Sequence, residues 1–266
     1  MNPRCVQTRQ GGRIGHEVHQ SRSANLQRGG SVGTAPDQSQ AQEAVPVGRR
    51  FTIVHGIWRP PLGLYHSSML AAVVLAGGDS TRMGTPKALL TAPDGQPFVV
   101  RIVRAFAEAG IGTIAVVTGS AHEGIAEALA GAALGVVPRV VRNADPARGQ
   151  VSSLWTGMDA VAGDDTDGLL VTLVDVPMLS PGTITTVVEA WRQSRAPIVR
   201  PAVGKRHGHP VLFDRALFDE LRHAPLEVGA KGVVRRHDAR VLNVTPPDLG
   251  CLRDIDTPED YRALLG

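Results

Sequence analysis

Charged side chains follow an apolar run in the first third of the sequence, in a loop suited to phosphate chemistry. The glycine-rich segment LAGGDSTRMGTPK spans residues 75–87. Its Gly77 and Gly78 can adopt backbone conformations closed to other residues, so that successive N–H groups can converge on phosphate oxygens. Arg82 and Lys87 would add full positive charge for a triphosphate. The loop matches neither the Walker A nor the dinucleotide-binding pattern, and alone it could equally be a tight connection with a solvated arginine.

Acidic side chains form a second candidate group. Asp175 ends an apolar run in the segment LVDVPML, and a carboxylate at the tip of a buried strand can bind a hard cation such as Mg²⁺. Asp254 and Asp256 would point to the same side of an extended segment, so either could be the second metal ligand. A turn or a helix cap would also account for each aspartate.

These two groups favour nucleotidyl transfer over acyl or hydride transfer. Nucleotidyl transfer needs little from side chains beyond positioning and charge neutralisation, which the loop and the aspartates could supply. The sequence contains no G-x-S-x-G nucleophile elbow and no H-E-x-x-H metal motif. We therefore expect a magnesium-dependent enzyme that acts on a nucleoside triphosphate.

The segments that must position these residues alternate between short apolar strands and helical patterns. Such alternation predicts an α/β domain with a Rossmann-like, mostly parallel sheet flanked by helices. In sheets of this kind ligands bind beyond the carboxyl ends of the strands, where the loop and Asp175 fall. We expect strands at 70–75, 114–118, 136–141, 169–174, 198–201, 211–213 and 241–244, and helices at 97–110, 123–129, 152–161, 181–193 and 257–265.

The first 68 residues differ in composition from the rest of the chain. They are rich in Gln, Ser, Gly, Arg and Pro and have no helical or strand period, which predicts a disordered N-terminal extension. Their net charge is about +5, whereas residues 69–266 carry about −2. The basic character belongs to the extension, and nucleic acid is not expected as a partner. Because Met69 directly precedes the first strand, we expect the working domain to be 69–266.

Composition excludes several other classes of protein. Apolar residues make up 42% of the chain, but no apolar run approaches the roughly 20 residues of a membrane helix. Cys5 and Cys251 lie far apart without metal-ligand spacing, which argues against a disulfide scaffold or a zinc site. No secretory signal is recognisable, so the cytoplasm is the expected compartment.

Five motifs, in their order along the chain, resemble the MobA-like nucleotidyltransferases and especially their molybdenum cofactor cytidylyltransferase branch. They are LAGGDSTRMGTPK, NADPARGQVSSL at 143–154, LVDVPML at 173–179, GHPVLF at 208–213 and DIDTPEDY at 254–261. The resemblance covers nearly all of residues 70–266 and implies a fold of the nucleotide-diphospho-sugar transferase type. It also implies transfer of a nucleoside monophosphate, preferably CMP, to the phosphate of a molybdopterin-type cofactor, with a molybdoenzyme as the eventual recipient.

The resemblance implies roles for individual residues. Arg82 and Lys87 would be the catalytic cations that hold the triphosphate, and Asp175 and Asp256 would bind Mg²⁺. The nucleotide-binding residues would be Leu75, Ala76, Gly77, Gly78, Arg82, Lys87, Gln150, Ser152 and Ser153.

One departure from the family pattern concerns the base. The cytidylyltransferase branch usually has Ala-Ala-Gly where this chain has Ala76, Gly77 and Gly78. A double glycine is more typical of the guanylyltransferase branch. The segments GQVSSL and DIDTPEDY favour cytidine, so CTP is the expected nucleotide and GTP the alternative.

The resemblance also implies residues that bind the acceptor. His209 and Pro210 would lie against it, although His209 could instead stabilise its own turn. Another departure from the family pattern concerns this acceptor. The segment VGAKGVVRRH at 228–237 has Ala230 where the family usually carries an acidic residue. A sugar phosphate or another small phosphate is therefore an alternative acceptor, and an oxidoreductase or accessory protein on the same fold is an alternative of another class.

Overall fold

The computed structural model describes residues 69–78 and 83–266. These residues belong to one compact unit. The expected disordered extension and Arg82 lie outside the described residues. Within the described ranges, no helix is both long and apolar enough to cross a membrane.

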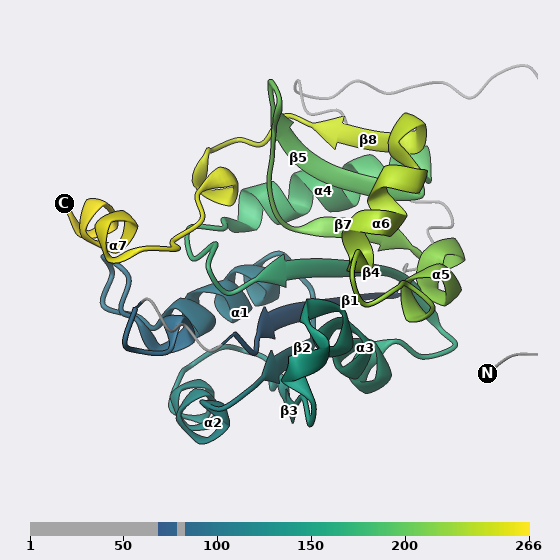
Figure 1. Ribbon diagram of the computed structural model, residues 1–266. Coiled ribbons are helices and arrows are strands. Elements are labelled where there is room, and N and C mark those ends of the chain that lie inside the picture. Colours follow the sequence, from purple (N-terminus) through teal and green to yellow (C-terminus); the bar gives the residue numbers. More distant parts are fainter. Residues whose placement is uncertain (1–68, 79–82) are drawn as a thin grey trace, which may run out of the picture. The chain divides into compact units, whose positions relative to one another are not determined.

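A mixed sheet of eight strands forms the centre of the described unit (Figure 1). Its order is β3-β2-β1-β4-β7-β5-β6, and β8 pairs with β5. Strands β3, β2, β1 and β4 are parallel neighbours, and β8 is parallel to β5, whereas β7 is antiparallel to both β4 and β5. The strands are β1 (Met69–Ala76), β2 (Thr113–Thr118), β3 (Arg139–Arg142), β4 (Thr166–Leu173), β5 (Ile198–Val203), β6 (Arg206–His207), β7 (Val211–Asp214) and β8 (Val241–Val244). The predicted α/β class is confirmed.

Helices cover both faces of the sheet, with α3, α5 and α6 on one face and α1 and α4 on the other (Figure 1). The alternation of side chains along β1 explains why two cores form. Ala72 and Val74 pack into the core under α1 and α4, whereas Ala71 and Val73 pack into the core under α3. The helices are α1 (Phe98–Glu108), α2 (His122–Ala130), α3 (Gln150–Val161), α4 (Pro181–Ser194), α5 (Phe218–Arg222), α6 (Gly229–Arg236) and α7 (Pro258–Leu265).

Local sequence signals fix the ends of several helices. The side chain of Ser180 accepts a hydrogen bond from the Thr183 amide at the start of α4, and a proline occupies the first turn. Helix α7 begins with a capping box between Thr257 and Asp260. These caps place the preceding segments, which carry Asp175 and Asp256, next to the ends of the helices.

The predicted secondary structure differs from the structure at the third strand and at β6, α5 and α6, of which the last three were not expected. The third strand begins at Arg139 rather than at residue 136, because Pro138 cannot donate a hydrogen bond to the neighbouring strand. Helix α6 was not expected, since Gly229 and Gly232 lower its helix propensity. It forms because Val233 is fully buried in the core between α6 and the sheet.

Candidate active site

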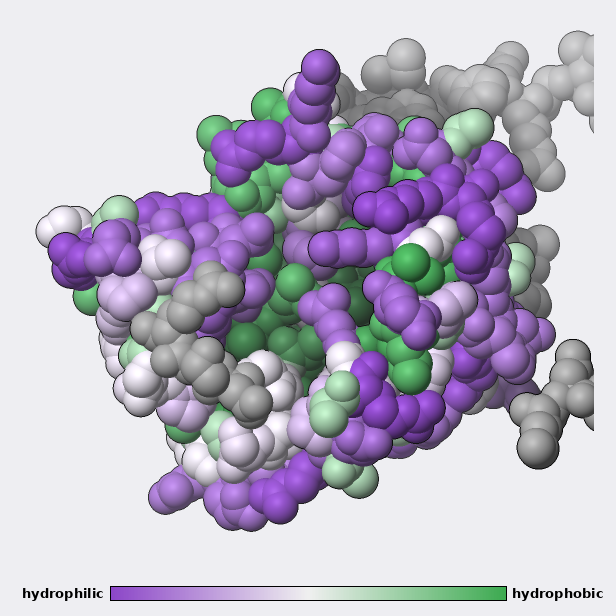
Figure 2. Space-filling view, in the orientation of Figure 1, coloured by the Kyte–Doolittle hydropathy of each residue, from purple (hydrophilic) through white to green (hydrophobic). Residues whose placement is uncertain are grey.

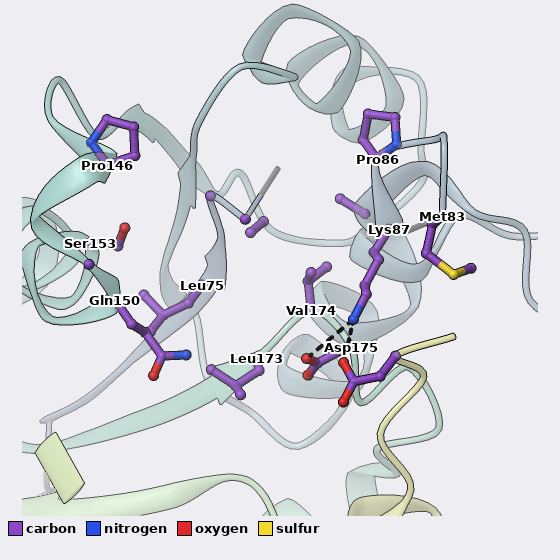
Figure 3. Close-up of a pocket in the computed structure, with 16 residues that line it drawn as sticks. Leu75, Met83, Pro86, Lys87, Pro146, Gln150, Ser153, Leu173, Val174 and Asp175 are labelled. Carbon is purple, nitrogen blue, oxygen red and sulfur yellow. Dashed lines mark hydrogen bonds and ion pairs between the residues drawn. The ribbon is translucent and has the colours of Figure 1, made fainter. Parts of the chain in front are cut away.

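A cavity of about 400 Å³ opens at the carboxyl ends of β1 and β4, and we call it the first cavity. The loop after β1, the short helix Lys87–Leu89, the end of β4 and the first turn of α3 form its walls. Figure 3 shows Gln150 and Ser153 on one side of the view and Lys87 and Asp175 on the other. This is the edge of the sheet where an open α/β fold binds its ligands.

One cation and two carboxylates meet in the first cavity. The Nζ atom of Lys87 lies 2.5 Å from Oδ1 of Asp256 and 3.8 Å from Oδ2 of Asp175 (Figure 3). The side chains of Lys87 and Asp175 are only 15% and 22% exposed, so water screens their interaction poorly. The arrangement brings together three of the residues that the sequence singled out from segments far apart in the chain.

A backbone contact explains why Asp256 reaches this place. The amide of Ile255 donates a hydrogen bond of 2.8 Å to the carbonyl of Asp175, and the Ile255 side chain is fully buried. Asp256 therefore lines the first cavity, whereas Asp254 lines neither this cavity nor the second cavity defined below. The geometry distinguishes Asp256 from Asp254, which reasoning from the residues alone could not do.

Asp175 is held in an environment that disfavours its negative charge. Burial raises the pKa of Asp175 to about 6, against the attraction of Lys87, and repulsion from Asp254 and Asp256 adds to the rise. Its Oδ1 atom is buried and has no hydrogen-bond partner among the described residues. A divalent cation would satisfy this oxygen and favour the ionised carboxylate.

The described residues contain no cluster of three or more acidic, His or Cys side chains able to hold a metal ion. Two carboxylates, Asp175 and Asp256, are what the first cavity offers. That set suits Mg²⁺, which commonly takes one or two carboxylates and completes its shell with water and substrate phosphate oxygens.

Polar contacts on the α3 side of the first cavity separate the roles of two adjacent serines. The buried side chain of Asn143 donates hydrogen bonds of 2.9 Å to both Ser152 and Ser153. The Ser152 hydroxyl also contacts the carbonyls of Asp145 and Gly149, and this serine does not line the cavity. Ser153 does line it. A Cβ atom added to Gly77 would come within 3.3 Å of the Ser153 Oγ atom, so the glycine leaves room beside this hydroxyl.

A second cavity, of about 570 Å³, adjoins the first. Leu75, Gln150 and Leu173 line both. The floor of the second cavity is largely apolar, and charged residues from β5 and α6 lie around it, among them Arg200, Lys231 and Arg235. Figure 2 shows a hollow on this face with a hydrophobic floor and hydrophilic surroundings. Such a site suits a flat ligand with polar substituents.

His209 lines the second cavity and contacts strand β4. Its Nδ1 atom lies 3.3 Å from the carbonyl oxygen of Val171, and burial lowers the pKa of the imidazole. Gly208 precedes it in close contact with the Cys251 carbonyl, where a Cβ atom would come within 2.3 Å of the oxygen. Pro210 follows a cis peptide bond and is buried; it is not among the residues that line the cavity.

Most of the residues proposed from the sequence line one of the two cavities. Those in the first cavity are Leu75, Ala76, Gly77, Gly78, Lys87, Gln150, Ser153, Asp175 and Asp256. Several lining residues lie within the quoted motifs but were given no role: Met83, Pro86 and Pro146 in the first cavity, and Lys231 and Arg235 in the second. Arg200 and Glu227, which line the second cavity, belong to no motif.

Comparison with known proteins identifies the family. Residues 72–241 match the MobA-like NTP transferase domain. The chain is a member of the MobA-like NTP transferase family. The predicted resemblance to this family is thereby confirmed, and this MobA-like protein is a nucleotidyltransferase.

Individual relatives cover about three quarters of the chain. The MobA-like protein is 28% identical to a "Probable molybdenum cofactor guanylyltransferase" of Mycobacterium avium (strain 104), over 74% of this chain and 96% of the relative. It is similar to the crystal structure of Rv0371c from Mycobacterium tuberculosis H37Rv, with a TM-score of 0.60, 27% identity and coverage of 74% of this chain and 98% of that one. A structure of Rv0371c in complex with manganese has a TM-score of 0.54, 26% identity and the same coverage. The names of these relatives do not support the expected preference for cytidine.

Proposed function

We propose that this MobA-like protein transfers GMP from GTP to the phosphate of a molybdopterin-type cofactor and releases pyrophosphate. The observation that carries the proposal is the pair of adjoining cavities. The first contains a lysine and two carboxylates, as a nucleoside triphosphate with a divalent cation requires, and the second offers an apolar floor with cationic surroundings for a flat, anionic acceptor.

The shared wall of the two cavities supports a direct transfer. Leu75, Gln150 and Leu173 line both cavities, so an acceptor phosphate at this boundary can approach the α-phosphorus of the nucleotide. A phosphate oxygen of the acceptor forms a bond to the α-phosphorus while the bond from that phosphorus to the bridging oxygen breaks. Pyrophosphate leaves with the electron pair of the broken bond, and no covalent enzyme intermediate is required.

Lys87 and the two carboxylates share the electrostatic work of this step. Lys87 neutralises negative charge on the triphosphate and on the departing pyrophosphate. Asp175 and Asp256 would hold Mg²⁺, which when bound supplies positive charge at the phosphate oxygens. The buried, unpartnered Oδ1 of Asp175 and the manganese complex of a similar protein support this assignment.

The choice of guanosine rests on two observations. The relative from Mycobacterium avium is named a guanylyltransferase, and Gly77 occupies the position at which the cytidylyltransferase branch usually has alanine. Because a Cβ atom at this position would come within 3.3 Å of Ser153 Oγ, the glycine widens the first cavity beside that hydroxyl. Cytidine is the second candidate, and the resemblance of GQVSSL and DIDTPEDY to the cytidylyl branch favours it.

Pyrophosphate release by the full chain tests the proposal. GTP and CTP would each be supplied with Mg²⁺, in the presence and absence of molybdopterin. Release that requires molybdopterin and is faster with GTP is the expected result. A preference for CTP would move the protein to the cytidylyl branch, and no release with either nucleotide would overturn molybdopterin as the acceptor.

A further inference from the structure

The imidazole of His209 presents a defined hydrogen-bonding atom to the second cavity. A backbone carbonyl can only accept a hydrogen bond, so the contact with Val171 places the proton of the neutral imidazole on Nδ1. The Nε2 atom then carries a lone pair and no proton. In the largely apolar cavity that this residue lines, His209 is therefore an acceptor for an N–H or O–H group of a ligand.

Glu227 supplies a second acceptor to the same cavity. It is the only carboxylate among the described residues that line the second cavity. Within the described part of the chain, its side chain has no hydrogen-bond or ion-pair partner, whereas Glu220 on the neighbouring helix α5 is paired with Arg236 and His237. A carboxylate left without a protein partner at a ligand cavity is available to a ligand.

The backbone around Glu227 is fixed rather than loosely attached. The amides of Val228 and Gly229 both donate to the carbonyl of Pro225, at 3.2 and 2.8 Å. Gly229 has a φ of +52° and packs its Cα against Val151 of α3, where a Cβ atom would lie 3.4 Å from the valine. This tight turn holds Glu227 at the edge of the cavity, directly before α6.

We propose that Glu227 and His209 together recognise the amino-pyrimidinone edge of a heterocyclic acceptor; this inference rests on the function proposed above. A ring N–H beside an exocyclic amino group presents two parallel donors, as a guanidinium does, and a carboxylate accepts both. Nε2 of His209 accepts a further donor of the ligand. The apolar floor would cover the faces of the ring. Lys231 and Arg235 line the same cavity and could pair with the anionic substituents of the ligand.

The inference also accounts for a missing acid in this chain. Family members usually carry an acidic residue where Ala230 stands, and Ala230 lines the second cavity three residues after Glu227. Glu227 would bring a carboxylate to the same cavity from the preceding turn. The substitution Ala230→Asp should therefore supply a carboxylate that takes over the role of Glu227.

Binding of two fluorescent heterocycles to the full chain tests the inference without turnover. Pterin carries the 2-amino group, whereas lumazine has a carbonyl oxygen in its place and is otherwise the same ring system. We expect wild-type protein to bind pterin about tenfold more tightly than lumazine, since a carboxylate distinguishes an amino group from a carbonyl. Glu227→Gln should abolish this preference, and the double variant Glu227→Gln with Ala230→Asp should restore it.

Matched variants separate recognition from stability. Glu123→Gln, an exposed carboxylate on α2 outside both cavities, should leave the pterin preference unchanged. His209→Asn keeps a donor for the Val171 carbonyl but removes Nε2, and it should weaken pterin binding about tenfold, whereas His209→Gln should recover part of it.

Two outcomes would overturn the inference in distinguishable ways. If wild-type protein binds pterin and Glu227→Gln retains the full preference over lumazine, the role of Glu227 is refuted and the proposed function stands. If wild-type protein binds neither heterocycle, or binds both equally, the second cavity does not read an amino-pyrimidinone edge. GTP-dependent pyrophosphate release with molybdopterin then decides whether the proposed function fails as well.

Discussion

The two cavities of this protein differ in how their chemistry is built. In the first, Lys87 pairs with both Asp175 and Asp256, and the three form a preorganised charged centre. In the second, Glu227, Lys231 and Arg235 have no ion-pair partners within the described ranges and surround an apolar floor. The first cavity is suited to holding charge that changes during a reaction, and the second to recognising the shape and edge of a ligand.

This contrast shows that neighbouring strands of one sheet can serve different purposes, one group for phosphate chemistry and the other for recognition of a ligand. The carboxyl ends of β1 and β4 carry the residues for phosphate chemistry, while β5, β7 and α6 contribute the walls of the second cavity. If the division is real, changes in the first cavity should abolish turnover and spare pterin binding. Changes in the second should weaken pterin binding and raise the KM for molybdopterin, with kcat unchanged.

The largest expected effect comes from Asp175→Asn, which removes a charge and keeps the shape of the side chain. Pyrophosphate release should fall by about 10³-fold or more, because the variant loses a ligand for the cation. Pterin binding in the second cavity should not change. Asp254→Asn is the matched control, since Asp254 lines neither cavity, and its rate should stay within about threefold of wild type. Retention of a tenth of the wild-type rate by Asp175→Asn would break the comparison.

The same aspartate should make stability depend on pH in the metal-free protein. Burial raises the pKa of Asp175 to about 6 from an ordinary value of 3.8, so the folded state binds this proton more tightly than the unfolded state. The contribution of Asp175 to the free energy of unfolding is therefore most favourable below pH 4. It falls by up to about 3 kcal/mol as the pH rises through 4 to 6, and is constant above that range.

Thermal melts of the wild type and of Asp175→Asn at pH 4.5 and 7.5, without metal, check this sign. The variant should be the more stable protein at pH 7.5, and the difference should shrink at pH 4.5. An equal difference at both values would show that Asp175 does not titrate as described. The test bears on the comparison because it measures how much the charged centre of the first cavity lowers the free energy of unfolding.

A pair of lysine substitutions compares the cavities directly. Lys87→Met should lower kcat/KM for the nucleotide about 10²-fold, because its cation is lost from the triphosphate site. Lys231→Met should leave kcat and the KM for the nucleotide unchanged and raise the KM for molybdopterin several-fold. Steady-state kinetics with each substrate varied in turn separate the two effects. Equal effects of both variants on the nucleotide would mean that the cavities do not divide their tasks.

The smallest of the expected effects on nucleotide use concerns the base. Gly77→Ala places a methyl group 3.3 Å from Ser153 Oγ and should shift the ratio of kcat/KM for GTP over CTP toward CTP by about tenfold. Gly78→Ala is its control, because a Cβ atom there would meet nothing within 4 Å. A similar shift in both variants would indicate a general effect on the loop and not a narrowed base site.

The first cavity could largely be predicted from the sequence, because its residues follow two strands whose apolar runs are unmistakable. The carboxyl ends of β1 and β4 meet in a parallel sheet, so the loop at Gly77 and the carboxylate of Asp175 had to lie close together. The choice of Asp256 over Asp254 depended on the hydrogen bond from Ile255 to the Asp175 carbonyl, which no local pattern encodes.

The second cavity could not be predicted, for reasons that are also physical. Helix α6 contains two glycines and has only eight residues, so its pattern is too short to reveal which side chains face the sheet. Arg200 comes from a short strand, and its place at the cavity depends on the pairing of β5 with β7 and β8. Asn143, beside the first cavity, begins one of the quoted motifs, but no role could be assigned to it, since its contacts of 2.9 Å with the serines of α3 form only in the folded chain.

The wall shared by Leu75, Gln150 and Leu173 has a consequence for the fate of the product. On the proposed reaction, the dinucleotide that forms occupies both cavities at once and keeps the contacts of the acceptor and of the transferred nucleoside monophosphate, whereas the contacts of the pyrophosphate are lost. Two linked ligands bind more tightly than either alone, because the second contact becomes intramolecular. Dissociation of the dinucleotide then limits turnover. A molybdoenzyme that takes the dinucleotide directly from the open cavities would therefore raise the turnover rate as well as receive the product.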